Sequence, residues 1–211
     1  MSDSPQAVNR TPSAGEACVA LAEVRLAIAW KVRGDPAQAA FVAEAERALG
    51  MPLPLQPNTS TRNAAGAVFW LGPRAWLFVA GADFPRNDFD DVRRRLGDAG
   101  GALFDVSASY ATWSVSGAAA LRVLNKGCPL DLHPRAFPAG HCAQSLLGHI
   151  HAVFYRPDDA STFIVMVARS FAADAWDFLT ASAASDGYRI GPPVSFGALE
   201  WPLQGPRARQ D

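Results

Sequence analysis

Apolar residues spaced three and four positions apart mark four segments of the chain as amphipathic helices. In the first segment, Asp35 can cap the N-terminus, Pro36 suits the first helical position and Gln38 completes a capping-box spacing. Gly50 is expected to end this helix. The other three helices are expected over about 87–98, over 117–126 and from Ser170 onward.

Single residues also indicate how the later helices begin and end. Asn87 and Ser116 are suitable N-caps for the second and third helices. Gly127 is expected to take the left-handed conformation that commonly ends a helix. The three arginines at 93–95 fall on the polar side of the second helix, so we expect them to lie mostly in solvent.

Short apolar runs between these helices predict β-strands. They cover residues 24–32, 67–71, 76–80, 102–106, 110–115, 142–155 and 162–168. Alternation is clearest at 110–115, where Ala111, Trp113 and Val115 face one way. The runs on either side of Gly72-Pro73-Arg74 predict a hairpin that is apolar on both faces, so both of its faces should be covered.

Short strands with interspersed helices, many hairpins and few long crossovers predict an α+β fold with antiparallel sheets. The folded part is expected over 21–204, with subdomains of about 21–115 and 116–204 and sheet elements crossing between them. The polar stretches 1–20 and 205–211 are expected to be disordered tails.

Composition narrows the possible partners and the compartment. The chain has 211 residues and a net charge of −1, so neither a nucleic acid nor an anionic membrane is an expected partner. No signal peptide is evident, and no apolar run approaches the roughly 20 residues that span a bilayer. The odd number of cysteines, Cys18, Cys128 and Cys142, argues against a disulfide framework. We therefore expect a cytoplasmic protein.

No local motif predicts catalysis or cofactor binding. His149 and His151 would lie on one face of a strand, and His141 and Cys142 could add further ligands for a metal ion. The spacing of these residues is not typical of a zinc site. We therefore favour an exposed strand end over a metal site. Nucleophile and phosphate-loop motifs are absent. The carboxylate pairs 90–91 and 158–159 are expected in solvent, and Cys128 and Cys142 are expected to be small buried thiols. No catalytic, cofactor-binding or metal-binding residue is predicted.

One loop is more tightly specified than a surface connection requires. Its residues are Lys126, Gly127, Cys128, Pro129, Leu130, Asp131, Leu132, His133 and Pro134. Asp131 can accept backbone N–H bonds, and the two prolines restrict the path of the chain. Such a loop packs against something, either the adjacent helix of its own chain or a partner. The residues alone favour neither interpretation.

The same loop carries a family resemblance. Together with Phe137 and Cys142-Ala143-Gln144, it resembles the signature of the gamma subunit of heterotetrameric sarcosine oxidase. Further matching pieces follow in order at 32–36, 53–59, 70–73, 76–77, 105–107, 167–171 and 176–179, so the resemblance spans about 24–180. Arg74-Ala75 and Ala108 stand where the family commonly has acidic residues, which puts any surface contacts made by those acids in doubt.

The resemblance implies a fold and a function. The fold would be two ferredoxin-like subdomains, like part of the folate-binding fold of aminomethyltransferases such as the glycine cleavage T protein. The complex would oxidatively demethylate sarcosine to glycine, producing hydrogen peroxide and either 5,10-methylenetetrahydrofolate or formaldehyde. FAD, FMN, NAD, zinc and tetrahydrofolate would be bound by the alpha, beta and delta subunits. This chain would be a structural, non-catalytic subunit of the oxidoreductase.

Partner contacts are expected at the loop, at the hairpin carrying Trp70 and Trp76, and around Trp201. Charged residues are only 18% of the chain, against a usual value of about 25%, which suits a subunit that is rarely alone. Two alternatives remain. One is a stand-alone folate-dependent transferase of the aminomethyltransferase superfamily. The other is a folate binder of iron–sulfur assembly, which shares Lys-Gly-Cys but continues differently.

Overall fold

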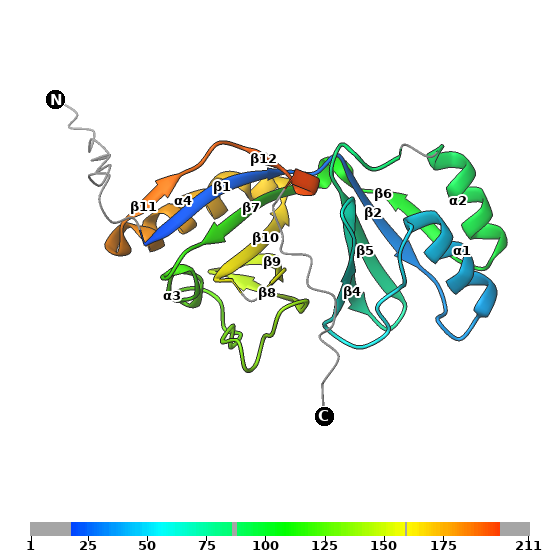
Figure 1. Cartoon of the computed structure of the whole chain (residues 1–211), viewed down its shortest axis with the longest axis horizontal. Helices are drawn as coiled ribbons and strands as arrows, with labels where there is room; N and C mark the ends of the chain where they lie inside the picture. The colour runs from blue at the N-terminus through cyan, green and yellow to red at the C-terminus, as the bar shows by residue number, and fades with distance from the viewer. Residues whose placement is uncertain (1–17, 86–87, 159, 199–211) are drawn as a thin grey trace.

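Two β-sheets form the centre of the molecule, and helices cover their outer faces (Figure 1). The computed structural model describes residues 18–85, 88–158 and 160–198. The expected tail 205–211, the contact at Trp201 and the cap at Asn87 therefore lie outside the described residues. Val19 and Ala20, which were expected in the N-terminal tail, already belong to the first strand because Val19 and Leu21 are core residues.

The five-stranded sheet has the strand order β3-β4-β5-β2-β6. Its strands are β2 (Ile28–Arg33), β3 (Ser60–Arg62), β4 (Gly66–Gly72), β5 (Ala75–Ala80) and β6 (Ala102–Asp105). Helices α1 (Ala39–Leu49) and α2 (Phe89–Asp98) connect them and cover the outer face. The path β2-α1-β4-β5-α2-β6 is the ferredoxin-like pattern, with β3 added at the edge of β4.

The seven-stranded sheet has the order β11-β1-β7-β10-β9-β8, and β12 also pairs with β1. Its strands are β1 (Val19–Arg25), β7 (Tyr110–Ser116), β8 (Cys142–Leu147), β9 (Ile150–Tyr155), β10 (Thr162–Ala168), β11 (Tyr188–Ile190) and β12 (Val194–Ser195). Helices α3 (Ala120–Asn125) and α4 (Ala172–Ala183) pack on its outer face. Strand β1 lies between β7 and β11, antiparallel to the former and parallel to the latter.

The chain changes sheets twice. The expected strand 24–32 is in fact two strands, since β1 pairs with β7 in one sheet and β2 pairs with β5 and β6 in the other. The second change falls at the short 3₁₀ turn η1 (Ser107–Ser109), before β7. Strand β7 pairs with β10 along its whole length, so this change lies a few residues before the subdomain boundary expected at about 115/116.

Three apolar cores fill the molecule. One lies between the seven-stranded sheet and α3 and α4, another between the five-stranded sheet and α1 and α2, and the third between the two sheets. The hairpin β4–β5 contributes to two of these cores: Trp76 and Phe78 face the helices, while Phe69, Leu77 and Val79 face the other sheet. The prediction that both faces of this hairpin are covered is confirmed.

The helix ends match the predictions in part. Gly50 ends α1 in the left-handed conformation as expected, with φ 69°. Asp35 accepts a hydrogen bond from the Ala37 amide at 3.0 Å, but the helix starts only at Ala39 and Gln38 forms no capping box. Helix α3 starts later than expected, because Gly117 has a φ of 110° and turns the chain before the helix begins.

The remaining segments fit with small shifts. The expected run 142–155 is divided into β8 and β9 by a turn at Gly148, which has a φ of 64°. The 3₁₀ turn η2 (Arg169–Phe171) precedes α4, so Ser170 lies within that turn. Two further 3₁₀ turns are η3 (Ala184–Asp186) and η4 (Phe196–Ala198). Within the described residues, no helix is both long and apolar enough to cross a bilayer.

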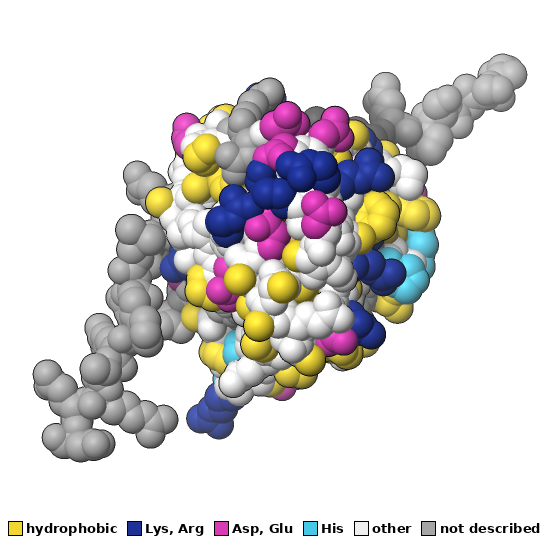
Figure 2. Space-filling model, turned by 90° about the vertical axis from the view of Figure 1, so that its right-hand side faces the viewer, with side chains coloured by type: hydrophobic (Ala, Val, Ile, Leu, Met, Phe, Trp, Pro, Cys, Tyr) yellow, Lys and Arg dark blue, Asp and Glu magenta, His cyan; other side chains and the backbone are white. Residues whose placement is uncertain are grey.

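The outer face of α1 and α2 is a mixed field of positive and negative side chains (Figure 2). Arg95 bonds to Glu44 at 3.0 Å and so connects the two helices. Arg93 and Arg94 are exposed as predicted, whereas Arg95 is half-buried by this contact. Burial raises the pKa of Glu44, but hydrogen bonds from Arg47 and Arg95 outweigh it and hold the pKa below its usual value. This face is therefore a solvated, charge-balanced surface.

Candidate functional site

The loop that follows α3 is fixed to its own chain at Lys126. The Lys126 ammonium donates to the Ser182 carbonyl at 2.5 Å, to Ser185 Oγ at 2.9 Å and to Asp186 Oδ2 at 3.0 Å. These bonds join the end of α3 to the end of α4. Hydrogen bonds from Lys126 and Arg122 hold the pKa of Asp186 below its usual value. The Lys126 side chain therefore serves to hold the ends of these two helices together.

Gly127 is required for close packing and not for a left-handed turn. It is not among the residues with positive φ, so the predicted conformation is wrong. A Cβ at this position would lie 2.2 Å from the ring of Phe178 and 2.7 Å from the Gly148 nitrogen. The Gly148 amide donates to the Gly127 carbonyl at 2.9 Å. The loop passes between α4 and the β8–β9 turn at this position, and only glycine leaves enough room for it to do so.

The inward side of the loop is anchored in the core. Cys128, Leu132 and Phe137 are buried, with Leu132 fully inaccessible, and Leu130 is half-buried against the same cluster. The Cys128 amide donates to the Leu124 carbonyl at 2.9 Å, which closes the end of α3. Burial raises the pKa of the Cys128 thiol, so it remains protonated at neutral pH. The sequence left open whether this loop packs against the adjacent helix of its own chain or against a partner. For the inward side of the loop, packing against its own chain is correct.

The outward side of the loop is exposed and ordered by local bonds. We call it the loop crest, and it comprises Pro129, Asp131, His133, Pro134 and Arg135. The Asp131 carboxylate accepts from the His133 amide at 2.9 Å, as the sequence predicted. Figure 1 shows the loop extending from α3 away from the sheets. The crest is thus presented to solvent on a backbone held by buried anchors.

The far end of the loop connects the two sheets. The Gly140 carbonyl accepts from both the amide and the hydroxyl of Ser60, at 2.9 and 2.7 Å. The Cys142 amide donates to the Asn58 carbonyl at 2.9 Å, and Asn58 itself has a φ of 59°. The segment 52–59, which contains three prolines and precedes β3, is therefore hydrogen-bonded to the start of β8. Burial raises the pKa of the Cys142 thiol to about 12, as befits a packed thiol.

The two hairpin tryptophans do not share one role. Trp76 is only 1% exposed, its indole Nε1 donates to the Pro54 carbonyl at 2.8 Å, and its ring lies 5.8 Å from that of Phe41. Trp76 is therefore a core residue, and the idea that it forms part of a partner surface is corrected. Trp70 is half-buried and packs against the same cluster.

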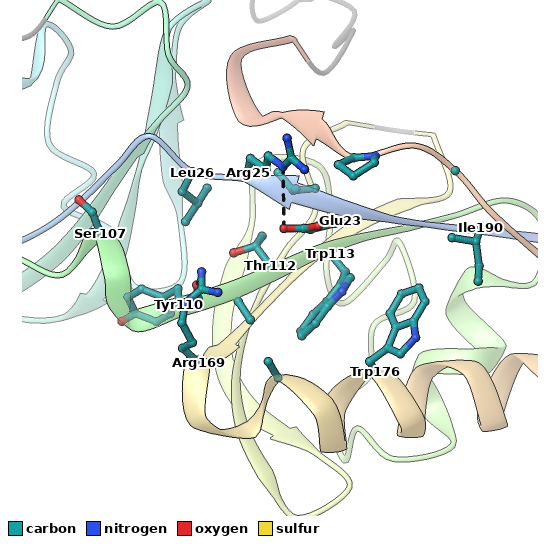
Figure 3. Close-up of a pocket in the computed structure, with 15 residues that line it drawn as sticks. Glu23, Arg25, Leu26, Ser107, Tyr110, Thr112, Trp113, Arg169, Trp176 and Ile190 are labelled. Atoms are coloured by element: carbon teal, nitrogen blue, oxygen red, sulfur yellow. Dashed lines mark hydrogen bonds and ion pairs between the residues drawn. The ribbon is translucent and has the colours of Figure 1, made fainter.

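A cleft of about 580 Å³, which the sequence did not indicate, lies where β1 separates from β7 (Figure 3). The pairing of these strands ends at Glu23 and Trp113, and β1 continues alongside β12 instead. Tyr110, Arg169 and Trp176 also line the cleft. Its existence depends on pairing between distant strands, which no local sequence signal reveals.

Arg169, one of the polar residues that line this cleft, is held by backbone carbonyls. The Arg169 guanidinium donates to the carbonyls of Ala108 and Tyr110, at 3.1 and 2.5 Å. Trp113 and Trp176 stack with ring centroids 6.3 Å apart. To hold a third aromatic ring between them, the two tryptophan rings would have to be roughly 7 Å apart, because stacked carbon layers lie about 3.5 Å apart. The observed separation is therefore too small for a ring to enter. Figure 3 shows Trp113 on β7 and Trp176 on α4, with Arg169 near Tyr110.

The other candidate residues do not converge. His149 lies in the β8–β9 turn and is exposed, as is His151 on β9. No group of three His, Cys, Asp or Glu side chains in the described ranges is arranged to hold a metal ion. Asp158, expected in solvent, is buried where the chain leaves β9, so the prediction for Asp158 is wrong. Asp159 lies outside the described residues.

The architecture defines a class of fold. The structure is similar to that of the glycine cleavage system aminomethyltransferase T from Bartonella henselae, with a TM-score of 0.59 and 15% sequence identity. The similarity covers 87% of this chain and 49% of that one. At this identity the likeness shows the fold alone. The predicted α+β fold with two antiparallel sheets, similar to the fold of aminomethyltransferases, is confirmed.

The relatives then define the family. A model of the sarcosine oxidase gamma subunit family matches residues 33–185. The chain is 37% identical to the sarcosine oxidase subunit gamma of Corynebacterium sp. (strain P-1) and 35% identical to that of Arthrobacter sp., each over 150 residues that cover 70% of this chain and 71% of the relative. This chain belongs to the sarcosine oxidase gamma subunit family.

A solved structure agrees with the family assignment. The chain matches the heterotetrameric sarcosine oxidase from Corynebacterium sp. U-96, determined in complex with pyrrole 2-carboxylate, with a TM-score of 0.71 and 27% identity. The match covers 82% of this chain and 88% of that one. The resemblance seen in the sequence is confirmed.

Proposed function

We propose that this chain is the gamma subunit of a heterotetrameric sarcosine oxidase and acts as a structural subunit of that enzyme. Its family and its similarity to a chain of such a complex support the assignment. The complex would demethylate sarcosine oxidatively to glycine, with hydrogen peroxide and either 5,10-methylenetetrahydrofolate or formaldehyde as further products. This chain would contribute assembly and not a reactive group.

The observation that carries the structural role is the two-sided loop 126–137. Its inner residues are buried in the core, and Lys126 is bound to the end of α4. Its crest is exposed, and the Asp131 carboxylate accepts a hydrogen bond from the His133 amide within it. A surface ordered before binding loses little conformational freedom when a partner covers it. The loop motif therefore suits a preformed contact with another subunit.

The ionisation of the buried groups supports a non-catalytic role. Burial raises the pKa values of Cys128, Cys142 and Tyr155, the last two to about 12. A thiol or phenol that stays protonated at neutral pH is a poor nucleophile or base. We place FAD, FMN, NAD, zinc and tetrahydrofolate in the alpha, beta and delta subunits, and the whole complex in the cytoplasm.

Purified protein tests this role directly. The chain alone should produce no hydrogen peroxide from sarcosine and should bring no folate through purification, while a complex of all four subunits should turn sarcosine over. Sarcosine oxidation by the isolated chain would contradict the non-catalytic role. Stoichiometric folate in the isolated chain would instead support a stand-alone one-carbon protein.

A further inference from the structure

The inner faces of the two sheets pack against each other over only part of their length. Phe69 and Tyr155 touch across the interface, with ring centroids 4.7 Å apart. Farther along, Gln144 Nε2 donates to the Leu71 carbonyl at 2.9 Å. Gln144 also lines two hollows of about 430 and 410 Å³, the first formed by the seven-stranded sheet and the second formed, apart from Gln144, by the five-stranded sheet. Together these hollows form what we call the inter-sheet groove.

Apolar side chains are exposed along this groove. On the wall formed by the five-stranded sheet, Phe104 is 50% exposed and Leu71 is half-buried. On the opposite wall, Leu146 and Tyr110 are half-buried. Apolar surface gathered in a concave region with polar neighbours is typical of a site that another chain covers.

The groove is also positively charged. Lys31 and Arg33 alternate on β2, so both project from its inner face, and both are exposed. Within the described part of the chain, neither has an ion pair or a side-chain hydrogen bond, and no Asp or Glu lines either hollow. By contrast, Arg74, Arg94 and Arg122 are each paired with a carboxylate. The groove therefore lacks the carboxylate partner that these three arginines have.

We propose that the inter-sheet groove receives a segment of another subunit of the oxidase, and that this segment carries a carboxylate next to an apolar side chain. The carboxylate would lie at Lys31 and Arg33, and the apolar side chain would cover Phe104 and Leu71. The inference rests on the proposed function, since its occupant is a non-identical subunit. A second copy of this chain fits less well, because a two-fold contact through the groove would bring these cations together.

Lysine chemistry gives a sharp test. The chain contains only two lysines, and Lys126 is engaged by Asp186. Treating the purified complex with a carbodiimide, which joins an amine to a carboxylate in direct contact, should link Lys31 to an Asp or Glu of another subunit. Mass spectrometry of the digested product identifies both residues. The Lys31→Arg variant keeps the positive charge, so it should assemble normally and lose this cross-link.

Charge reversal tests the energetic contribution. Lys31→Glu should weaken association with the other subunits about tenfold or more, because like charges opposed across an interface repel. The thermal unfolding of the isolated chain should stay unchanged, since Lys31 is exposed. The matched control is Arg93→Glu, the same charge change at an exposed position on α2, which should assemble as the wild type does.

The outcomes separate this inference from the proposed function. A wild-type chain that never associates with the other subunits would contradict the proposed function itself. A wild-type complex that assembles, but in which Lys31 cross-links only to carboxylates of its own chain or a second copy, would overturn the groove proposal alone. Normal assembly of the Lys31→Glu variant would overturn it as well.

Discussion

Lys126 and Gly127 show how two residues of the loop motif serve the fold of this chain. Lys126 donates hydrogen bonds to the end of α4, and Gly127 leaves room for the ring of Phe178. Both residues hold the start of the loop in place. The crest, with Asp131 and His133, is the part left exposed to solvent. Substitutions at these two kinds of position should therefore have different effects.

Replacing Gly127 by alanine should destabilise the protein. The new Cβ would overlap Phe178 and the β8–β9 turn, and such overpacking typically costs about 1–3 kcal/mol. Chemical denaturation measures the change. Gly97→Ala is the matched control, because nothing lies within 4 Å of a Cβ at this position in α2. That substitution should raise stability by about 0.5–1 kcal/mol, and equal midpoints for the two variants would contradict the packing argument.

Asp186 should make stability depend on pH. Hydrogen bonds from Lys126 and Arg122 lower its pKa in the folded state, so its contribution is present above the unfolded pKa of about 3.9 and is lost as the pH falls through the folded value. Asp186→Asn should therefore be less stable than the wild type at pH 7. The difference in unfolding free energy should shrink below about pH 4. A difference that stays constant from pH 7 to pH 3 would refute the ionic contribution.

At the scale of elements, α2 depends on the residue that precedes it. The Asp88 carboxylate accepts from the Asp90 amide at 3.0 Å and so satisfies an unpaired helix N–H. The same helix buries Val92 and Leu96 against the five-stranded sheet. Its connection to α1 is the bond between Arg95 and Glu44. The cap, the buried stripe and this bond together set its position.

Removing this cap should weaken α2 measurably. Asp88→Ala should lower the free energy of unfolding by about 1 kcal/mol, a usual value for a lost N-cap. Denaturant titration at neutral pH gives the difference. Asp88→Ser should retain most of the stability, because a serine hydroxyl can accept the same bond. Equal losses for the alanine and serine variants would mean that the hydrogen bond is not what matters.

Patterns within a single element were predictable from sequence, and pairing between distant elements was not. The alternation at 110–115 correctly separated Ala111 and Trp113 from Thr112, because strand period is a local property. The split of 24–32 into β1 and β2 was missed, since each half follows a different partner strand. The cleft beside Trp113 was missed for the same reason.

The residues of the candidate loop were identified from the sequence, but most of their contacts were not. Asp131 was expected to accept a backbone N–H, and it does so. Gly127 was assigned to a turn because glycine usually ends helices that way, whereas here the contact with Phe178 requires it. Trp76 was expected at a partner contact, because no local pattern shows that α1 covers it through Phe41.

In the whole molecule, the packing of one sheet on the other accounts for much of the unusual composition. The chain is 18% charged and 49% hydrophobic. Much of the apolar content lies in the core between the sheets, which includes Phe69 and Leu77. The low charge is therefore explained in large part within the chain. The surfaces that we propose for partner contact are local: the crest, and the groove with Phe104.

The two sides of the loop should separate stability from assembly. Leu132→Ala should lower the unfolding free energy by about 2–5 kcal/mol, because it leaves a cavity in the core. Arg135→Ala, on the exposed crest, should leave the unfolding free energy nearly unchanged and weaken association with the other subunits. Denaturation and binding measurements on both variants check this. Unchanged association for Arg135→Ala would remove that residue from the contact surface.

Native mass spectrometry of the co-expressed complex tests whether this chain is a subunit of a four-subunit sarcosine oxidase. With an affinity tag on this chain, the purified particle should contain this chain together with three different subunits and should oxidise sarcosine. Omitting this chain should prevent the complete particle from forming. The account is contradicted if this chain is recovered alone while the other three subunits assemble and retain full sarcosine turnover.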